Sequence, residues 1–150
     1  MNLLSWIKSW NRKEAVEVPR LEDFEQQFMG LDVQAVIDAH LAWRKRLEGQ
    51  ILGTSSDELD LSLIMQDNQC VLGKWLYGQA ARSTLALHSE YEALREAHRV
   101  FHLYAARVVQ TLRMRGKEAA QAMLEADFDR LSKDIVFNLF SLVHKERALN

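Results

Sequence analysis

The spacing of apolar residues predicts a long amphipathic helix over residues 32–52. Asp32 is a typical helix N-cap, and Gly53 follows the last apolar position, as at many helix ends. Intervals of three and four residues bring the apolar positions onto one stripe, which is typical of a helix that packs on a core. This stripe contains Val33, Val36, Ile37, His40, Trp43, Leu47 and Ile51.

Two later segments, about 89–114 and about 117–147, repeat the same periodicity, and Gly116 separates them. The stripe of the first segment contains Tyr91, Leu94, His98, Phe101, His102, Ala105, Val108, Val109 and Leu112. A shorter helix is expected between the long ones. Asp67 or Asn68 would cap it, Cys70 would lie in its first turn, and it would end near Gly78.

The N-terminal 31 residues differ from the rest of the chain. Residues 2–12 form a short amphipathic stretch with Trp6 and Trp10 on its apolar side. Residues 13–20 have the composition of a linker, and a short helix is expected over 21–29, with a pause at Gly30. No strand alternation or repeat is visible. We therefore predict an all-α chain: an N-terminal amphipathic helix and linker in 1–31, then an antiparallel four-helix bundle in 32–150.

Composition narrows the class of protein. The chain has 150 residues, 48% of them hydrophobic and 27% charged, which is typical of a folded domain and not of a disordered one. Its net charge of −2 gives no reason to expect a nucleic-acid partner. The single cysteine cannot form an internal disulfide, no apolar run approaches bilayer length, and no signal peptide is visible. We expect a cytoplasmic protein.

Three histidines lie on the predicted apolar stripes, where an imidazole without a partner would cost roughly 1–3 kcal/mol. His98 and His102 are four residues apart, so one helix can offer both to a single metal ion. His40 would come from a facing helix and Cys70 from a third. Three imidazoles and one thiolate form a donor set that Zn²⁺ favours. The residues alone leave the alternative open, since a single core histidine or cysteine is more often a packed, hydrogen-bonded residue.

Catalytic interpretations fit the pattern less well. A zincin protease has Glu directly after the first histidine of its helix, whereas Arg99 follows His98. Di-iron bundles use Glu-x-x-His pairs, but Arg95 and Ile37 precede His98 and His40 by three residues. Nucleophilic catalysis by Cys70 has no accompanying substrate or oxyanion motif. We therefore expect no enzymatic activity.

Three short segments resemble the motifs of the bacterial chemoreceptor zinc-binding (CZB) domain family. They are residues 40–44 (His-Leu-Ala-Trp-Arg), 70–78 (Cys-Val-Leu-Gly-Lys-Trp-Leu-Tyr-Gly) and 98–102 (His-Arg-Val-Phe-His). The corresponding family motifs are His-x-x-Trp-Lys/Arg, Cys-x-Leu-Gly-x-Trp-Leu-Tyr and His-x-x-Phe-His. Residues 116–124 are similar to a weaker last segment, and the resemblance extends over about 32–145. It implies that His40, Cys70, His98 and His102 bind zinc.

The resemblance also implies a helical bundle that is often homodimeric and that occurs attached to chemoreceptors or diguanylate cyclases, or alone. Because residues 1–31 leave no room for a signalling domain, we expect a module that modulates such a partner in trans. Two alternatives stay open: an oxidant sensor that acts through the zinc-bound Cys70, and a structural adaptor with permanent zinc. In the adaptor, residues 2–12 would hold a partner, and weak contact of this segment with a membrane surface is a further option.

Several residues near the motifs have two interpretations. For Trp43, Trp75 and Tyr77 we favour core packing over a role in orienting ligands. Gly73 would either permit a close approach of backbone or only match a small neighbour. His88 and His144 do not share a stripe position with the other histidines and are left out of the site.

Overall fold

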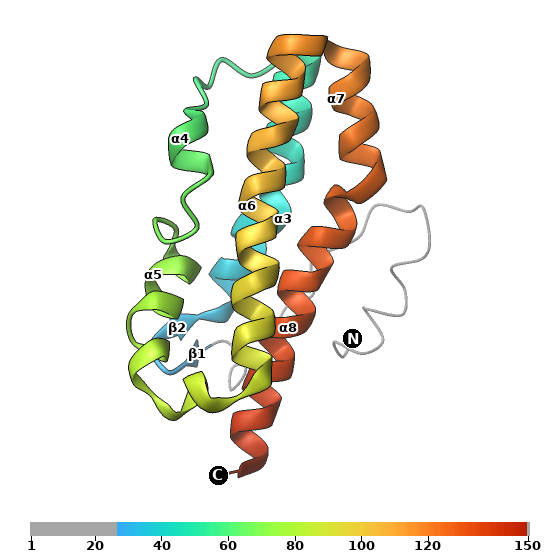
Figure 1. Cartoon of the computed structure of the whole chain (residues 1–150). Coiled ribbons are helices and arrows are strands. Elements are labelled where there is room, and N and C mark those ends of the chain that lie inside the picture. The colour runs from blue at the N-terminus through green and yellow to red at the C-terminus, as the bar shows by residue number, and fades with distance from the viewer. Residues whose placement is uncertain (1–26, 150) are drawn as a thin grey trace.

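Helices form most of the described part of the chain, which is residues 27–149 of the computed structural model (Figure 1). The predictions for residues 2–12, 13–20 and 21–26 lie outside the described residues. The main helices are α3 (Val33–Leu52), α4 (Leu61–Ile64), α5 (Val71–Tyr77), α6 (Ser89–Arg115), α7 (Lys117–Met123) and α8 (Asp129–Leu149). Two 3-10 turns, η1 (Ala80–Arg82) and η2 (Thr84–Leu87), and the π-helical turn η3 (Leu124–Phe128) complete them.

Helix α3 begins and ends where its sequence predicts. The Asp32 carboxylate accepts a hydrogen bond from the backbone N–H of Ala35 at 3.0 Å, which caps the helix start. Gly53 ends the helix in the left-handed conformation, with φ of 72°. These two caps set the 20-residue length of α3, and with it the position of His40 about two turns after the helix start.

The predicted helix over 117–147 is one helical arm with an interruption. Helix α7 passes into the π-helical turn η3, and α8 continues to Leu149. Phe128 lies in this turn and is fully buried, with its ring centroid 5.2 Å from that of Phe101 on α6. The extra residue of a π turn shifts the apolar stripe, and a regular period of 3.6 residues does not reveal such an insertion.

The prediction of helix over residues 27–29 is wrong. Gln27–Phe28 (β1) pairs antiparallel with Leu31–Asp32 (β2), in the register Phe28 opposite Leu31. Met29 and Gly30 turn the chain with positive φ values of 46° and 79°, which no right-handed helix allows. The buried Phe28 and Leu31 anchor this small hairpin, and the indole N–H of Trp75 donates to the carbonyl of Met29 at 2.9 Å.

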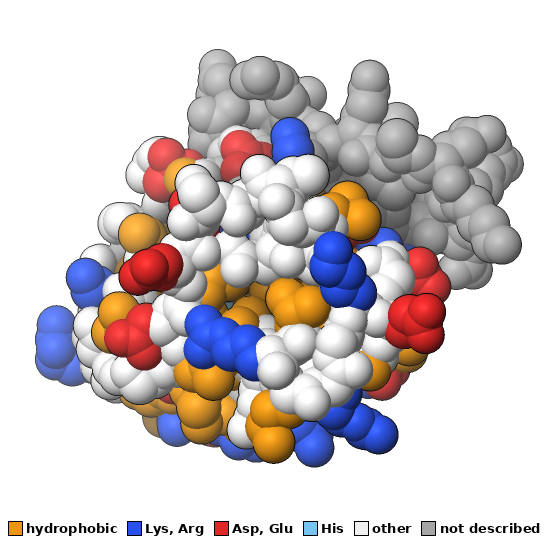
Figure 2. Space-filling view, turned by 90° about the horizontal axis from the view of Figure 1, so that it is seen from above, with side chains coloured by type: hydrophobic (Ala, Val, Ile, Leu, Met, Phe, Trp, Pro, Cys, Tyr) orange, Lys and Arg blue, Asp and Glu red, His pale blue; other side chains and the backbone are white. Residues whose placement is uncertain are grey.

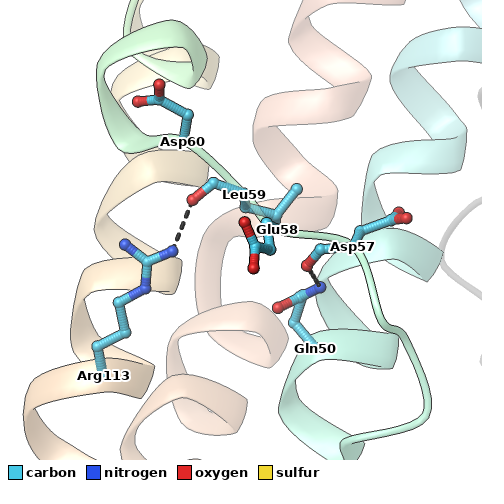
Figure 3. Close-up of a pocket in the computed structure, with 6 residues that line it drawn as sticks. All are labelled: Gln50, Asp57, Glu58, Leu59, Asp60 and Arg113. Atoms are coloured by element: carbon cyan, nitrogen blue, oxygen red, sulfur yellow. Dashed lines mark hydrogen bonds between the residues drawn. The ribbon is translucent and has the colours of Figure 1, made fainter.

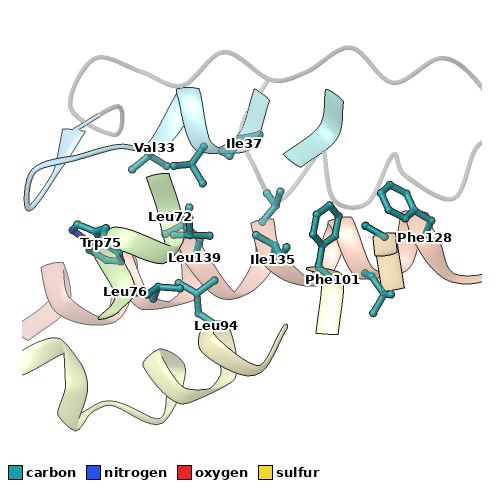
Figure 4. Packing of buried hydrophobic residues seen from close by; sticks show 14 of the residues in the cluster. Val33, Ile37, Leu72, Trp75, Leu76, Leu94, Phe101, Phe128, Ile135 and Leu139 are labelled. Carbon is teal, nitrogen blue, oxygen red and sulfur yellow. The ribbon is translucent and has the colours of Figure 1, made fainter. Parts of the chain in front are cut away.

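The long helices lie side by side around one core. Helices α3 and α6 run in the same direction, α7–α8 returns beside them, and the short α4 and α5 follow α6 on its other side (Figure 1). Buried side chains from all of these layers meet in one cluster, including Ile37, Leu72, Leu94, Phe101 and Ile135 (Figure 4). The all-α class is confirmed. The antiparallel four-helix bundle stays a prediction, because two short helices stand where a long one would complete it.

Among residues 27–149, none of the helices combines the length and the apolar character required to cross a bilayer. The boundary between residues 31 and 32 stays a prediction.

The contact between the π turn and α6 generates a stability prediction. Phe128→Ala removes a fully buried ring and is expected to lower the free energy of unfolding by about 3–5 kcal/mol. Phe137→Ala on α8, where the ring is 53% exposed, is the matched control and should change it by less than about 1 kcal/mol. Urea denaturation of the two variants measures the difference. Equal losses would mean that η3 does not form part of the core.

Candidate metal centre

Four side chains that lie far apart in the sequence meet at one point inside the protein. His40 extends from α3, Cys70 precedes α5, and His98 and His102 lie one turn apart on α6. One potential ligand atom from each of them lies within 4.8 Å of all the others. The structure therefore brings together the four residues that the sequence predicts, from three separate segments of the chain.

The three imidazoles are buried in the core. His40, His98 and His102 expose 4%, 0% and 4% of their surface. The ring centroids of His98 and His102 are 4.5 Å apart, and that of His40 lies 5.3 Å from His98 and 6.3 Å from His102. The rings meet edge to face rather than stacked, with interplanar angles of 66°, 83° and 80°.

Two backbone carbonyls determine which nitrogen carries the proton. Nδ1 of His40 lies 2.7 Å from the carbonyl oxygen of Val36, and Nδ1 of His102 lies 2.8 Å from that of Ile64. A carbonyl oxygen can only accept a hydrogen bond, so both Nδ1 atoms are protonated. Each Nε2 atom then keeps its lone pair. In His102 that atom lies 3.0 Å from Nε2 of His98.

Cys70 completes the cluster from the start of α5. Its Sγ atom lies 3.1 Å from Nε2 of His98 and 3.7 Å from Nε2 of His102. The same sulfur accepts the backbone N–H of Gly73 at 3.3 Å, which makes Cys70 the N-cap of the helix. The predicted caps Asp67 and Asn68, and the placement of Cys70 in the first turn, are therefore wrong. In the cap position the Cys70 sulfur accepts a hydrogen bond from the first turn of α5 and also faces His98 and His102.

Burial governs the protonation of these groups. Desolvation lowers the pKa of His40 to about 4, despite the opposing hydrogen bond to Val36. It lowers the pKa of His98 to about 2, with a further contribution from the charges of the neighbouring histidines, and it also lowers the pKa of His102. Burial raises the pKa of the Cys70 thiol. At neutral pH the metal-free cluster thus holds three neutral imidazoles and one thiol.

The cluster fits a single four-coordinate ion. Nitrogen and sulfur atoms bound to one Zn²⁺ at about 2.0–2.3 Å lie roughly 3.3–3.8 Å from one another. The shorter separations here, 3.0, 3.1 and 3.7 Å, and the 4.8 Å limit for all pairs span this range. Neutral imidazoles with inward lone pairs are the protonation state that binds metals. The Nδ1 atom of His98 is buried without a hydrogen-bond partner among the described residues.

A glycine permits the close approach that places Cys70. A Cβ atom added at Gly73 would lie only 1.8 Å from the carbonyl oxygen of Asp67 and 2.9 Å from Cα of Asn68. The backbone before Cys70 therefore passes directly over the first turn of α5. Of the two interpretations of Gly73, close approach of backbone is confirmed.

The aromatic and acidic residues around the motifs are arranged partly as predicted. Trp75 is buried and Trp43 packs against the core, but Tyr77 is 41% exposed, so the prediction of core packing is wrong for Tyr77. Its hydroxyl donates to the Asp67 carboxylate at 2.6 Å. This bond holds the loop before Cys70 to the end of α5. It also engages the Asp67 carboxylate, which was expected to cap the helix.

His88 and His144 lie outside the cluster, as predicted. Nε2 of His88 is 2.7 Å from the Glu146 carboxylate near the end of α8, and His144 is exposed. Sequence reasoning missed the carbonyls of Val36 and Ile64, which orient two of the imidazoles. Every residue has a carbonyl group, so no sequence signal distinguishes these two.

Fold and site together define a helical domain with a buried three-histidine, one-cysteine cluster that is suited to a metal ion. The family model described as the chemoreceptor zinc-binding domain matches residues 40–109, a span that contains all four cluster residues. The resemblance of the three motifs to the CZB family is therefore confirmed over residues 40–109. No curated protein and no solved structure shows a significant match to the chain.

The steric role of Gly73 can be tested against a second glycine. Gly73→Ala forces the backbone before Cys70 away, so we expect the variant to lose more than about 3 kcal/mol of unfolding free energy and to bind metal poorly. A Cβ atom added at Gly53 would meet no atom within 4 Å, but the backbone there has φ of 72°. Gly53→Ala should therefore lower the free energy of unfolding by only about 1–2 kcal/mol. Denaturation and metal titration of both variants make the comparison. A Gly73→Ala protein as stable as the Gly53→Ala protein would contradict the close approach.

The lowered histidine pKa values predict acid sensitivity of the metal-free protein. Below about pH 6.5 the unfolded chain binds protons at His40 and His98, whereas the folded chain does not do so until about pH 4 and pH 2. The free energy of unfolding should therefore fall as the pH decreases, by up to about 1.4 kcal/mol per pH unit for each histidine. Denaturant titrations at pH 7 and pH 5 measure this slope.

His98→Gln should reduce the fall in unfolding free energy with decreasing pH by the contribution of one histidine. His144→Gln changes an exposed side chain and should leave this pH dependence unaltered. A free energy of unfolding that is equal at pH 5 and pH 7 would rule out buried neutral imidazoles.

Proposed function

We propose that the protein is a zinc-binding sensory or regulatory module that holds one Zn²⁺ through His40, Cys70, His98 and His102. The observation that carries this proposal is the convergence of two carbonyl-oriented imidazoles, a third imidazole and a thiol within 4.8 Å. Lone pairs that face one another in a buried site repel, and a cation at their centre removes this repulsion. The nitrogen and sulfur donor set favours Zn²⁺ over the hard ions Mg²⁺ and Ca²⁺.

Three backbone groups support the side chains of this site. Val36 and Ile64 hold the rings of His40 and His102 in the orientation that directs Nε2 inward. The backbone N–H of Gly73 supports negative charge on the Cys70 sulfur, which must lose its proton to become a ligand. Bound Zn²⁺ would supply the positive charge that offsets the buried thiolate. Because four protein ligands leave no position for water, we propose a regulatory role and no catalysis.

The same four residues join three helices, and this supports a role in signalling. Structural zinc contributes on the order of 10–16 kcal/mol of apparent binding free energy in small domains, so occupancy would strongly affect how α3, α5 and α6 are held together. We propose that a signalling partner of the chemoreceptor or diguanylate cyclase type responds to the difference between the zinc-bound and the zinc-free arrangement of these helices. Homodimerisation remains an expectation from the family.

The oxidant-sensor alternative has weaker support. Burial raises the pKa of the Cys70 thiol, which makes the metal-free residue a poor nucleophile. Oxidation would therefore have to act on the metal-bound thiolate. The adaptor alternative depends on residues 2–12, which lie outside the described residues.

The zinc site predicts the metal content of the purified protein. Untagged protein should contain about one zinc per chain. His40→Ala, Cys70→Ala, His98→Ala and His102→Ala should each lower affinity by a factor of about 100 or more, because each removes a direct ligand. Native mass spectrometry and competition with a chromophoric chelator provide the measurements.

His88→Ala and His144→Ala are the matched controls, because they remove histidines outside the cluster. Both should retain full zinc. Protein that binds no zinc under reducing, chelator-free conditions would sink the proposed function, and full zinc in all four ligand variants would move the site elsewhere.

A further inference from the structure

The connector between α3 and α5, residues 53–70, is bound along helix α6 at three points. The guanidinium of Arg113 donates to the carbonyl of Leu59 at 2.6 Å. The imidazole of His102 donates to the carbonyl of Ile64 at 2.8 Å, and the sulfur of Cys70 lies 3.1 Å from Nε2 of His98. The two segments run in opposite directions, so the contacts pair successive connector positions with successively earlier positions on α6.

All three contacts use one face of α6. Arg113 lies 11 residues after His102, and 11 residues are about three turns of helix, a rise of about 16 Å. His98 lies one turn before His102 on the same stripe. Two of the three contacts involve predicted zinc ligands. The third, at Arg113, is made by a residue that is too distant to reach the metal.

The outer end of the connector is built as a defined structure. The Asp60 carboxylate accepts hydrogen bonds from the backbone N–H and the hydroxyl of Ser62, at 2.8 and 2.7 Å, and so caps α4. The amide of Gln50 on α3 donates to the carbonyl of Asp57 at 2.7 Å. Leu59 and Ile64, at the two ends of this short segment, are both 6% exposed. The single turn of α4 thus links the carbonyl that binds Arg113 to the carbonyl that orients His102.

A cleft of about 510 Å³ opens beside this end of the connector (Figure 3). It is lined by Gln50, Asp57, Glu58, Leu59, Asp60 and Arg113. Figure 3 shows that the bonds from Gln50 and Arg113 hold the connector from α3 on one side and from α6 on the other. Seen along the helices from this end, the surface carries both acidic and basic side chains around an apolar hollow (Figure 2).

We propose that Arg113 is a positioning residue for the metal centre. By fixing the carbonyl of Leu59, it holds α4 against α6 and keeps the carbonyl of Ile64 in place for His102. This inference rests on the proposed zinc-binding function and adds to it a residue that the family's ligand motifs do not contain. Because coupling between two sites is reciprocal, metal bound at His102 and Cys70 restrains the connector in return, and the shape of the cleft depends on metal occupancy.

The first experiment measures Zn²⁺ affinity by chelator competition in Arg113→Ala, with Arg113→Lys and Arg115→Ala beside it. Loss of a residue that supports a metal ligand costs about 10–100-fold in affinity, and we expect about 3- to 10-fold for Arg113→Ala, which acts one step further away. Arg113→Lys keeps a donor and should recover most of the affinity. Arg115→Ala removes the same charge two residues away and should bind Zn²⁺ like the unaltered protein.

The second experiment measures amide hydrogen exchange of the full chain with and without Zn²⁺. In the unaltered protein Zn²⁺ should slow exchange over residues 57–64 as well as around the ligands. In Arg113→Ala the slowing should persist near His98 and His102 but be lost at 57–60. The result that overturns the inference is an Arg113→Ala protein with the affinity and the protection pattern of Arg115→Ala. Absence of Zn²⁺ binding in the unaltered protein would instead refute the proposed function.

Discussion

The structure depends on one constraint, which is that three imidazoles lie in the interior with too few hydrogen-bond partners for their nitrogen atoms. Val36 and Ile64 satisfy one nitrogen each of His40 and His102, and this leaves the opposite lone pairs directed at the centre of the cluster. Nε2 of His98 faces the same centre, 3.0 Å from Nε2 of His102 and 3.1 Å from the Cys70 sulfur. A core residue that serves packing alone would be replaced at lower cost by an apolar side chain. The arrangement of these atoms is therefore compatible with a cation at the centre of the cluster.

The rest of the architecture positions these few atoms. Asp32 and Gly53 define the ends of α3 and thereby the position of His40 along the helix axis. The four-residue interval on α6 places His98 beside His102. Cys70 comes from a loop that must pass within contact distance of α5, which only a glycine at position 73 allows. The connector that ends at Cys70 also supplies the carbonyl of Ile64. One segment therefore provides one proposed metal ligand and orients another, and its outer end is bound by Arg113, three turns after His102 on α6.

Sequence reasoning succeeded where the physical cause was local. Helical periodicity, the Asp32 cap and the interval between His98 and His102 depend on residues within one helix, and they agree with the structure. It failed at positions where a distant contact decides. Residues 27–29 form a strand and turn because Phe28 and Leu31 are buried, Phe28 beside Trp75, and the Trp75 indole binds the carbonyl of Met29 in the turn. Asp67 binds Tyr77, and the cap position passes to the sulfur of Cys70. The π turn at Leu124–Phe128 inserts a residue that apolar spacing does not disclose.

The sequence by itself determined the helical class and the His98–His102 interval, because apolar periodicity and spacing along one helix are sufficient for these. Its motifs indicated His40 and Cys70 as well, but only through their resemblance to a family. Tertiary structure alone decided that the four side chains meet, since His40, Cys70 and the pair on α6 are joined only by packing between elements. It also decided the protonation pattern, because the carbonyls of Val36 and Ile64 have no distinguishing letter in the sequence and orient the imidazoles only once the chain has folded around them.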